Sequence, residues 1–153
     1  MSLLQRTFRT DSTSAAPLLL RLMLGAVFIG HGAQKLFGWW GGSGFQATAD
    51  FMGKAIGILP GPVLASLAGG GQFFGGILLV LGLCTRFAAA QIAFIMGVAI
   101  WTAHRSTFFL ADNGMEFALT LLVIAVALVL TGGGALSFDA RLAARTSKIK
   151  PGK

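Results

Sequence analysis

Apolar residues fill four long stretches of the chain, and turn-forming or charged residues separate these stretches. They cover residues 17–37, 62–83, 87–104 and 113–131. An α-helix rises about 1.5 Å per residue, so about 20 residues cross the roughly 30 Å hydrocarbon core of a bilayer. Each stretch approaches or exceeds this length. The pattern therefore predicts an all-α fold, a bundle of four transmembrane helices.

The longest connection, residues 38–61, carries a second pattern. Apolar and polar residues recur there at helical spacing on two different faces; the apolar set is Phe45, Ala49, Met52 and Ile56, and the polar set is Gln46, Asp50 and Lys54. A helix with two such faces is typical of the membrane interface, and Trp39 and Trp40 suit an interfacial aromatic belt. We expect a short amphipathic interfacial helix here, acting either as a lid or as a simple connector.

Composition supports a membrane protein with one domain. The 153 residues are 55% hydrophobic and only 11% charged, which does not suit a soluble domain of this size. We expect the membrane domain to cover residues 15–142, with tails at 1–14 and 143–153. The single cysteine, Cys84, excludes an intramolecular disulfide and a CxxC redox pair, so we assign it no role.

Basic residues predict the orientation of the bundle. Four spans place both termini on one side, and nine basic residues fall there against three on the other side. The nine are Arg6, Arg9, Arg21, Arg86, Arg141, Arg145, Lys148, Lys150 and Lys153, and the three are Lys35, Lys54 and Arg105. Cytoplasmic loops carry an excess of Lys and Arg, so we expect both termini in the cytoplasm. The basic tail suits anionic lipid headgroups. Without a soluble domain that reads bases, nucleic-acid binding is not expected.

Small residues indicate how the helices pack. Glycines surround Gln72, and Gly71 with Gly75 forms a GxxxG spacing, so we expect Gln72 to face the bundle. Comparable stripes are predicted on the third and fourth helices. The first is Ala90, Ala93, Gly97, Trp101 and His104, and the second is Glu116, Thr120, Val123 or Ile124, Ala127 and Thr131.

Polar residues gather at the outer ends of three predicted helices. His31, Gln34 and Lys35 occupy neighbouring helical positions in the first helix, and His104 and Glu116 lie at the same level of the third and fourth. An imidazole and a carboxylate inside a membrane are able to exchange protons with a carbonyl-bearing ligand such as a quinone. No catalytic residue is assigned. The candidate ligand-binding residues of this outer pocket are His31, Gln34, Lys35, Gln72, Trp101, His104 and Glu116.

A structural interpretation of the charged residues stays open beside the functional one. Charged residues end any span at the interface, and Asp112 with Asn113 is a natural N-cap for the fourth helix. Arg21, near the other end of the first helix, is expected to reach the interface with its long side chain. No HxxxH or HxxE spacing pairs two ligands on one helix, so no metal site is expected. His31 and Glu116 lie deeper in apolar sequence and are the main functional candidates.

Several motifs, in order, resemble the DoxX family of small bacterial membrane proteins. The motifs are R-L-x-L-G-x-x-F-x-x-H-G-x-x-K-L at 21–36, L-x-L-G-L-x-T-R at 79–86 with A-A-A after it, N-G-x-E at 113–116, and G-G-G-A-L-S-F-D at 132–139. The resemblance implies a four-helix bundle in the bacterial plasma membrane. It also implies a link to thiosulfate:quinone oxidoreductase or to membrane complexes that handle oxidative or sulfur stress. Family members often carry Glu where this chain has Gln72, which weakens any mechanism that needs a carboxylate there.

Three hypotheses of function follow. The first is a membrane subunit of a redox system that binds a quinone-like lipophile at the outer pocket; because the chain has no cofactor motif of its own, a soluble partner would supply the electrons. The second is a non-enzymatic assembly or stress-response protein. The third is a small-molecule transporter that acts as a homo-oligomer. A bound quinone supports the first, whereas a co-purified protein without ligand supports the second.

Overall fold

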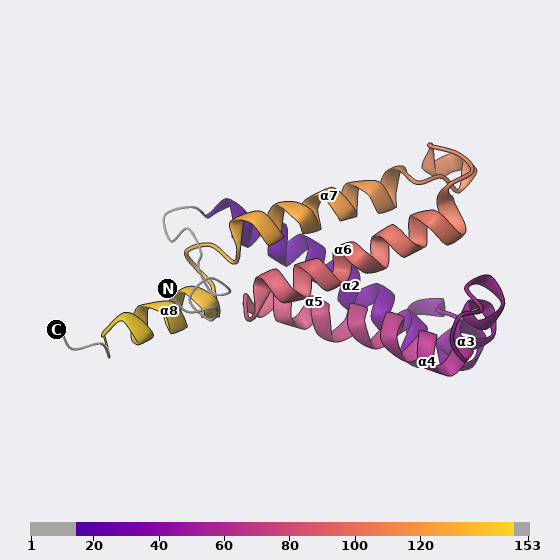
Figure 1. Ribbon diagram of the computed structural model, residues 1–153, viewed down its shortest axis with the longest axis horizontal. Helices are drawn as coiled ribbons and strands as arrows, with labels where there is room; N and C mark the ends of the chain where they lie inside the picture. The colour runs from indigo at the N-terminus through magenta and orange to yellow at the C-terminus, as the bar shows by residue number, and fades with distance from the viewer. Residues whose placement is uncertain (1–14, 149–153) are drawn as a thin grey trace.

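The structure, a computed structural model, describes residues 15–148 (Figure 1). The predicted tail 1–14 lies outside the described residues, and so do residues 149–153 of the second tail. The basic residues Arg6, Arg9, Lys150 and Lys153 belong to these parts of the chain.

Four apolar helical segments form the bundle, and the described residues contain no strand. They are α2 (Ala16–Phe37); α4 (Gly61–Ala65), continued by the π-helical turn η2 (Ser66–Gly70) and α5 (Gly71–Leu81); α6 (Thr85–Ala99), continued by the π-helical turn η3 (Ile100–His104); and α7 (Glu116–Thr131). The first three segments have 22, 21 and 20 residues and are long and apolar enough to cross a membrane, whereas α7 has 16 residues. The predicted all-α bundle is confirmed.

The ends of these helices follow local chemistry. Pro17 stands in the first turn of α2, where its missing N–H is not needed, and Gly38 ends α2 at φ 71°. Gly82 ends α5 in the same left-handed region. The predicted N-cap at Asp112 and Asn113 is wrong, because both residues belong to the preceding turn and α7 begins only at Glu116.

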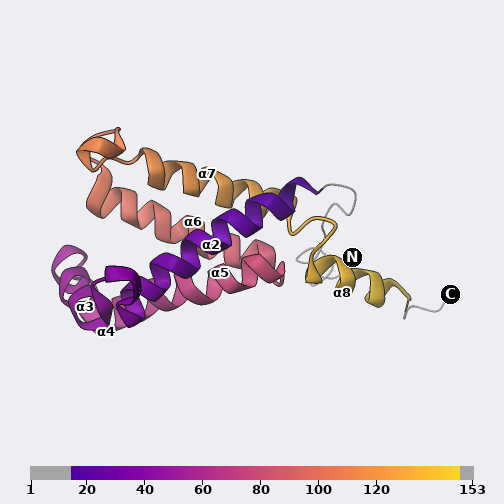
Figure 2. The ribbon, with the colours of Figure 1, turned by 180° about the vertical axis from the view of Figure 1, so that it is seen from behind.

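The connection after α2 contains the expected amphipathic helix, α3 (Gly44–Ala55), preceded by the 3-10 turn η1 (Trp39–Gly41). Its predicted apolar face is buried or half-buried, and its predicted polar face is exposed. Helix α3 packs against α4 and against the end of α2 (Figures 1 and 2). We call this end of the molecule the α3 end. The opposite end, where α8 (Phe138–Lys148) follows α7, is the α8 end.

Helices α2 and α5 make the closest contact of the bundle, and glycines allow it. A Cβ added at Gly76 would lie 2.8 Å from Gly25 O and from Ile29 N, and one at Gly32 would overlap the backbone of Phe73. Gly71 and Gly75, the predicted GxxxG pair, face α6 instead: a Cβ at Gly71 would overlap the Gln91 side chain, and one at Gly75 would lie 3.5 Å from Ile92. The tight seam is therefore formed by Gly25, Gly32 and Gly76.

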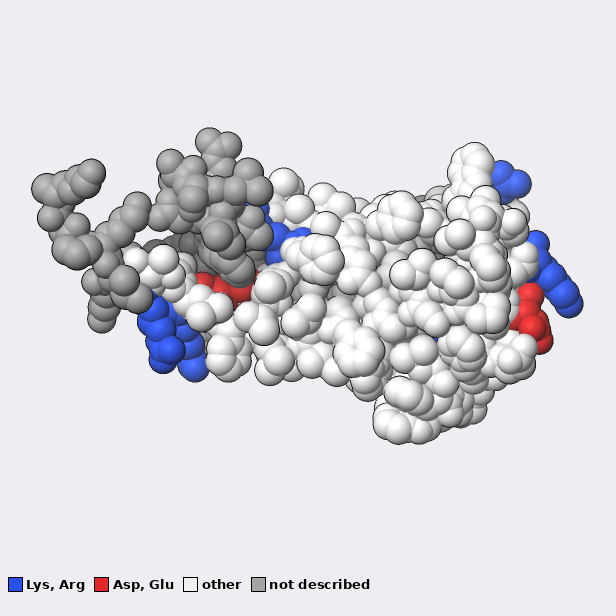
Figure 3. Space-filling model, turned by 60° about the horizontal axis from the view of Figure 1, so that its bottom comes forward, with Lys and Arg blue, Asp and Glu red and all other residues white. Residues whose placement is uncertain are grey.

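The core lies between these helices and the α6–α7 pair. It is formed by Leu24, Phe28, Leu79, Ala88, Ala89, Ile92, Met96, Ala118, Leu121, Ala125 and Leu128. The stripes predicted for the third and fourth helices are wrong, because most of their residues are exposed or half-buried and Trp101 is 70% exposed. Figure 3 shows uncharged residues over most of the visible face and charged ones mainly toward its two ends, as expected for a protein surrounded by lipid.

Candidate functional site

A cavity of about 480 Å³ lies between the end of α2 and α3. Its lining residues are Gln34, Lys35, Gly41, Gly42, Ser43, Ala47, Thr48, Phe51 and Met52. Two of them, Gln34 and Lys35, were predicted from the sequence as ligand-binding residues. The others come from the connection after α2 and from α3, so the amphipathic helix forms one wall of the cavity.

Close contacts fix the geometry of this cavity. A Cβ at Gly42 would lie 2.5 Å from Gln34 Cα, so only glycine lets the loop approach α2 this closely. Ser43 Oγ and Thr48 Oγ1 lie 3.1 Å apart and share a hydrogen bond. The Thr48 hydroxyl also donates to Lys35 O at 3.5 Å. The α2 backbone, the loop and α3 are thus joined through hydroxyl groups that face the same space.

Two further predicted residues lie deeper in the bundle on this side. His31 is half-buried one turn before Lys35. Gln72 is 4% exposed, as expected for a residue that faces the bundle, and its Oε1 atom accepts no hydrogen bond from the described residues. Gly69, three residues before Gln72, packs against Leu36 and Lys35. His31, Gln34, Lys35 and Gln72 therefore belong to neighbouring parts of α2 and α5.

The remaining predicted residues lie elsewhere. His104 Nδ1 is 2.9 Å from Asn113 O, and a Glu116 carboxylate oxygen accepts a hydrogen bond from Leu110 N–H at 2.8 Å. Trp101 faces outward, with the Arg105 guanidinium 5.1 Å from the centre of its ring. Figures 1 and 2 show the α6–α7 turn on the opposite edge of the α3 end from α3 and α4. The seven predicted residues thus divide between two places instead of forming one pocket.

Arg21 at the α8 end is the centre of a polar cluster that sequence analysis missed. It is only 1% exposed, so its side chain is buried by protein at this end of the bundle. Its Nη1 donates to Leu79 O at 3.2 Å and to Val80 O at 3.1 Å, and its Nη2 donates to Leu136 O at 2.8 Å. The guanidinium therefore binds the carbonyl groups at the end of α5 and in the segment after α7.

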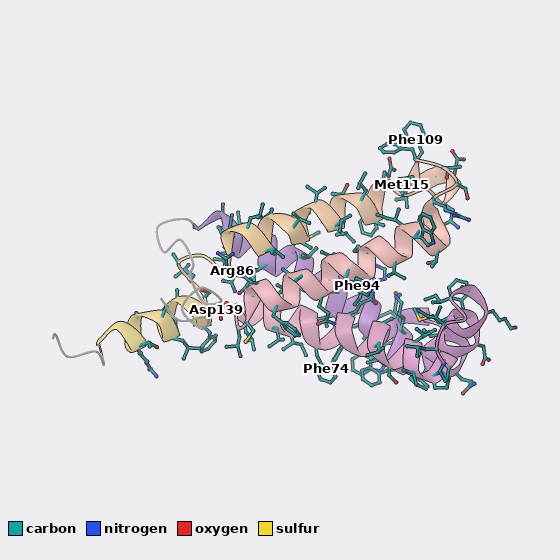
Figure 4. The ribbon with its side chains drawn as sticks, viewed as in Figure 1. Phe74, Arg86, Phe94, Phe109, Met115 and Asp139 are labelled. Carbon is teal, nitrogen blue, oxygen red and sulfur yellow. The ribbon has the colours of Figure 1, made fainter. Side chains whose placement is uncertain are left out.

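Asp139 completes this cluster from the first turn of α8. Its two carboxylate oxygens accept hydrogen bonds from Cys84 N–H at 2.8 Å and Thr85 N–H at 2.9 Å, where α6 begins. Its own N–H donates to Gly82 O at 3.0 Å. A carboxylate at a helix N-terminus also interacts favourably with the helix dipole. Figure 4 shows Asp139 where α8 meets this end of the bundle.

Glycines allow the parts of this cluster to pack closely. A Cβ at Gly133 would lie 2.7 Å from both Ser137 Cβ and Thr85 Oγ1, and one at Gly82 would lie 2.7 Å from Ser137 Cβ. Its residues come from the motifs at 21–36, 79–86 and 132–139, which was the signal in the sequence that these segments meet. The α2–α3 cavity, which contains two of the predicted ligand-binding residues, is the candidate ligand site among the described residues.

The fold and these two features define a helical membrane bundle that is closed by a buried polar cluster at one end and contains a cavity at the other. Residues 16–105 match the family model DoxX. The chain belongs to the DoxX family.

Three relatives extend the similarity beyond this match. The chain is 33% identical over 124 residues to a Bacillus subtilis protein named "Putative oxidoreductase CatD", covering 80% of this chain and 83% of that protein. It is 29% identical over 123 residues to an uncharacterized Haemophilus influenzae protein, with 80% of each covered. A second uncharacterized protein of that organism is 33% identical over 124 residues, with 78% and 85% covered. No solved structure matches the chain.

Proposed function

We propose that this protein is the membrane subunit of a redox system and that it binds a quinone-like lipophile in the α2–α3 cavity. The cavity carries the proposal, because its volume of about 480 Å³ suits a small ligand and its lining combines apolar side chains with four polar ones. The name of the Bacillus subtilis relative supports a redox role.

The lining groups match the chemistry of a quinone headgroup. Such a headgroup is a flat ring with two carbonyl oxygens, which accept hydrogen bonds. Lys35 and Gln34 provide N–H donors, and on the facing wall the Ser43 and Thr48 hydroxyls hold the loop and α3 in place through their own hydrogen bonds. Phe51 and Met52 supply apolar surface for the ring and the tail. The chain binds and orients the ligand, and a partner protein delivers the electrons.

The proposal places this bundle in the bacterial plasma membrane with both termini in the cytoplasm. Arg86, Arg141, Arg145 and Lys148 support this orientation, because they belong to the α8 end or to α8 itself. The cavity then lies at the outer face of the membrane. A lipophilic ligand reaches it from the lipid, and a partner protein approaches from outside.

Binding of a short-tailed quinone to protein in lipid nanodiscs tests the proposal. Quinones quench tryptophan fluorescence, and in a Trp101→Phe background the remaining Trp39 and Trp40 directly precede the cavity loop. A charged hydrogen bond contributes about 1.5–3 kcal/mol, so Lys35→Met should weaken binding about tenfold or more. Lys54→Met is the matched control, because it removes the same charge from an exposed position of α3 outside the cavity.

Two results would overturn the proposal. Equal affinity of the Lys35→Met variant and the parent protein would show that the ligand binds outside this cavity. Absence of saturable quenching by ubiquinone and menaquinone analogues would exclude a quinone as the ligand. If a protein partner co-purified in that case, the non-enzymatic assembly role would be the better explanation.

A further inference from the structure

The turn that joins α6 to α7, residues 105–115, precedes a helix that is shorter than the other apolar segments. With its π-helical turn, the α6 segment has 20 residues and rises about 30 Å, whereas α7 has 16 residues and rises about 24 Å. The two segments pack against each other as an antiparallel pair that is joined at the α3 end. Because α7 alone is too short to cross the hydrocarbon core, the turn that precedes it has to cover the remaining distance (Figure 1).

Three consecutive apolar residues cover the outside of this turn. Phe108, Phe109 and Leu110 are 53%, 63% and 53% exposed. Phe109 points away from the bundle at the tip of the turn (Figure 4). Exposed aromatic rings at this level are typical of residues that anchor a protein in the interface and the adjoining acyl chains.

The backbone of the turn forms many of its own hydrogen bonds. Residues 112–116 all donate N–H groups to carbonyl oxygens within the turn: Asp112 and Gly114 to Phe109, Asn113 to Leu110, Met115 to Thr107, and Glu116 to Phe108, at 2.9–3.1 Å. An exposed loop in water has no need of this, because water satisfies its polar groups. Irregular backbone next to lipid does need it, since each unsatisfied group there costs several kcal/mol.

Side chains satisfy three further groups of the same turn. Glu116 accepts the N–H of Leu110, the Thr107 hydroxyl donates to Asp112 O at 3.0 Å, and His104 pairs with Asn113 O. Two exposed charged residues, Arg105 and Asp112, flank the apolar triplet in sequence. The Arg105 guanidinium lies over the Trp101 ring, an arrangement suited to the headgroup level.

We infer that the 105–115 turn is a lipid anchor that inserts Phe108, Phe109 and Leu110 among the acyl chains of the leaflet at the α3 end. The side chains of Glu116 and His104 stabilise the turn through hydrogen bonds to its backbone, so their role is structural. This inference is independent of the proposed quinone site, which lies on the other side of the same end of the molecule.

Spin labels test the position of the turn. In a Cys84→Ser background, a nitroxide is attached at Phe109→Cys, and the protein is reconstituted in vesicles of phosphatidylcholine and phosphatidylglycerol. Phe94→Cys, on the exposed face of α6, is the lipid reference, and Lys54→Cys, on the polar face of α3, is the aqueous reference. We expect oxygen to reach the labels at 109 and 94 better than a water-soluble nickel complex does, with the reverse at 54.

Two outcomes would overturn the anchor. Nickel accessibility at 109 equal to that at 54 would place the turn in water. An immobile label that neither reagent reaches would show that a second copy or another protein covers it. Leu110→Cys repeats the measurement if Phe109→Cys does not fold.

The structural part of Glu116 is tested in the same system. Glu116→Gln keeps an oxygen that accepts the Leu110 N–H, whereas Glu116→Leu does not. We expect the label at 109 to become more mobile in Glu116→Leu and to stay unchanged in Glu116→Gln. A label that moves equally in both variants, or in neither, would overturn this assignment.

Discussion

Arg21 illustrates how burial reverses the meaning of a charged residue in an apolar helix. On a single helix its guanidinium is costly in lipid, so the interface is the expected place for it. In the bundle it lies among carbonyl groups 58, 59 and 115 residues away in the sequence. Val80 O lies at the end of α5 and Leu136 O in the segment before α8, whereas Leu79 O also accepts the Gly82 N–H at 3.0 Å. The two Nη atoms of Arg21 therefore bind these carbonyl groups, whereas its Nε atom has no hydrogen-bond partner among the described residues.

This arrangement predicts a large effect of Arg21→Met. The change keeps much of the apolar stem but removes all three hydrogen bonds to the carbonyl groups of Leu79, Val80 and Leu136. We expect the free energy of unfolding to fall on the order of 3 kcal/mol, as measured by denaturation with SDS in mixed micelles. Arg105→Met, which removes an exposed guanidinium, should change it by less than about 1 kcal/mol. Equal effects of the two variants would contradict a structural role for Arg21.

At the scale of the elements, the contact between α2 and α5 depends on which glycine faces the partner helix. Gly32 lies against the Phe73 backbone, whereas a Cβ at Gly30, two residues away on the same helix, would have no neighbour within 4 Å. A GxxxG spacing does not distinguish such positions. The contact between the two helix backbones, which the structure shows, distinguishes them.

The two glycines give a matched pair of variants. Alanine favours a helix over glycine by about 1 kcal/mol at either position. Gly30→Ala should therefore leave the protein unchanged or stabilise it by up to about 1 kcal/mol. Gly32→Ala should destabilise it by about 1–3 kcal/mol, because the methyl group forces α2 away from α5. SDS denaturation measures both, and a gain of stability in Gly32→Ala would show that the helices are not in close contact there.

The sequence analysis predicted the positions of the helices well, but it did not predict which side of each helix faces the core. The four apolar stretches agree with the observed segments to within a few residues at each end, since apolar length alone identifies them. Helix α3 was recognised from its two contrasting faces. Helices α6 and α7 offered no such contrast, because lipid and core both accept apolar side chains. Their buried sides, such as Ile92 and Leu121, therefore could not be separated from the exposed ones.

The candidate site was predicted in part for a related reason. The polar patch at the end of α2 supplies Gln34 and Lys35 to the cavity. The sequence analysis grouped His104 and Glu116 with them, because all four residues were expected at the same depth in the membrane. Depth does not determine lateral position, and the structure places these two residues in the α6–α7 turn. The contribution of Ser43 and Thr48 depends on how α3 folds back on α2, which no local pattern indicates.

At the scale of the whole molecule, the two ends differ in construction. The α8 end is held by Arg21 and Asp139, which join α2, α5, α6 and the segment before α8. The α3 end has the cavity on one side and the α6–α7 turn on the other. An end closed by hydrogen bonds and an end with a cavity fit the proposed function, in which ligand and partner approach from one side of the membrane.

That difference makes the orientation decisive for the proposed function. Exposed residues at the two ends, Lys54 on α3 and Arg145 on α8, allow it to be measured in a Cys84→Ser background. Lys54→Cys should react with an impermeant maleimide in intact cells, and Arg145→Cys should react only after the cells are permeabilised. The reason is the concentration of basic residues toward the α8 end, which favours the cytoplasm. Alkaline phosphatase fused after Lys153 should accordingly be inactive. The reverse labelling pattern would place the cavity on the cytoplasmic face, so that an electron-donating partner would have to be sought inside the cell.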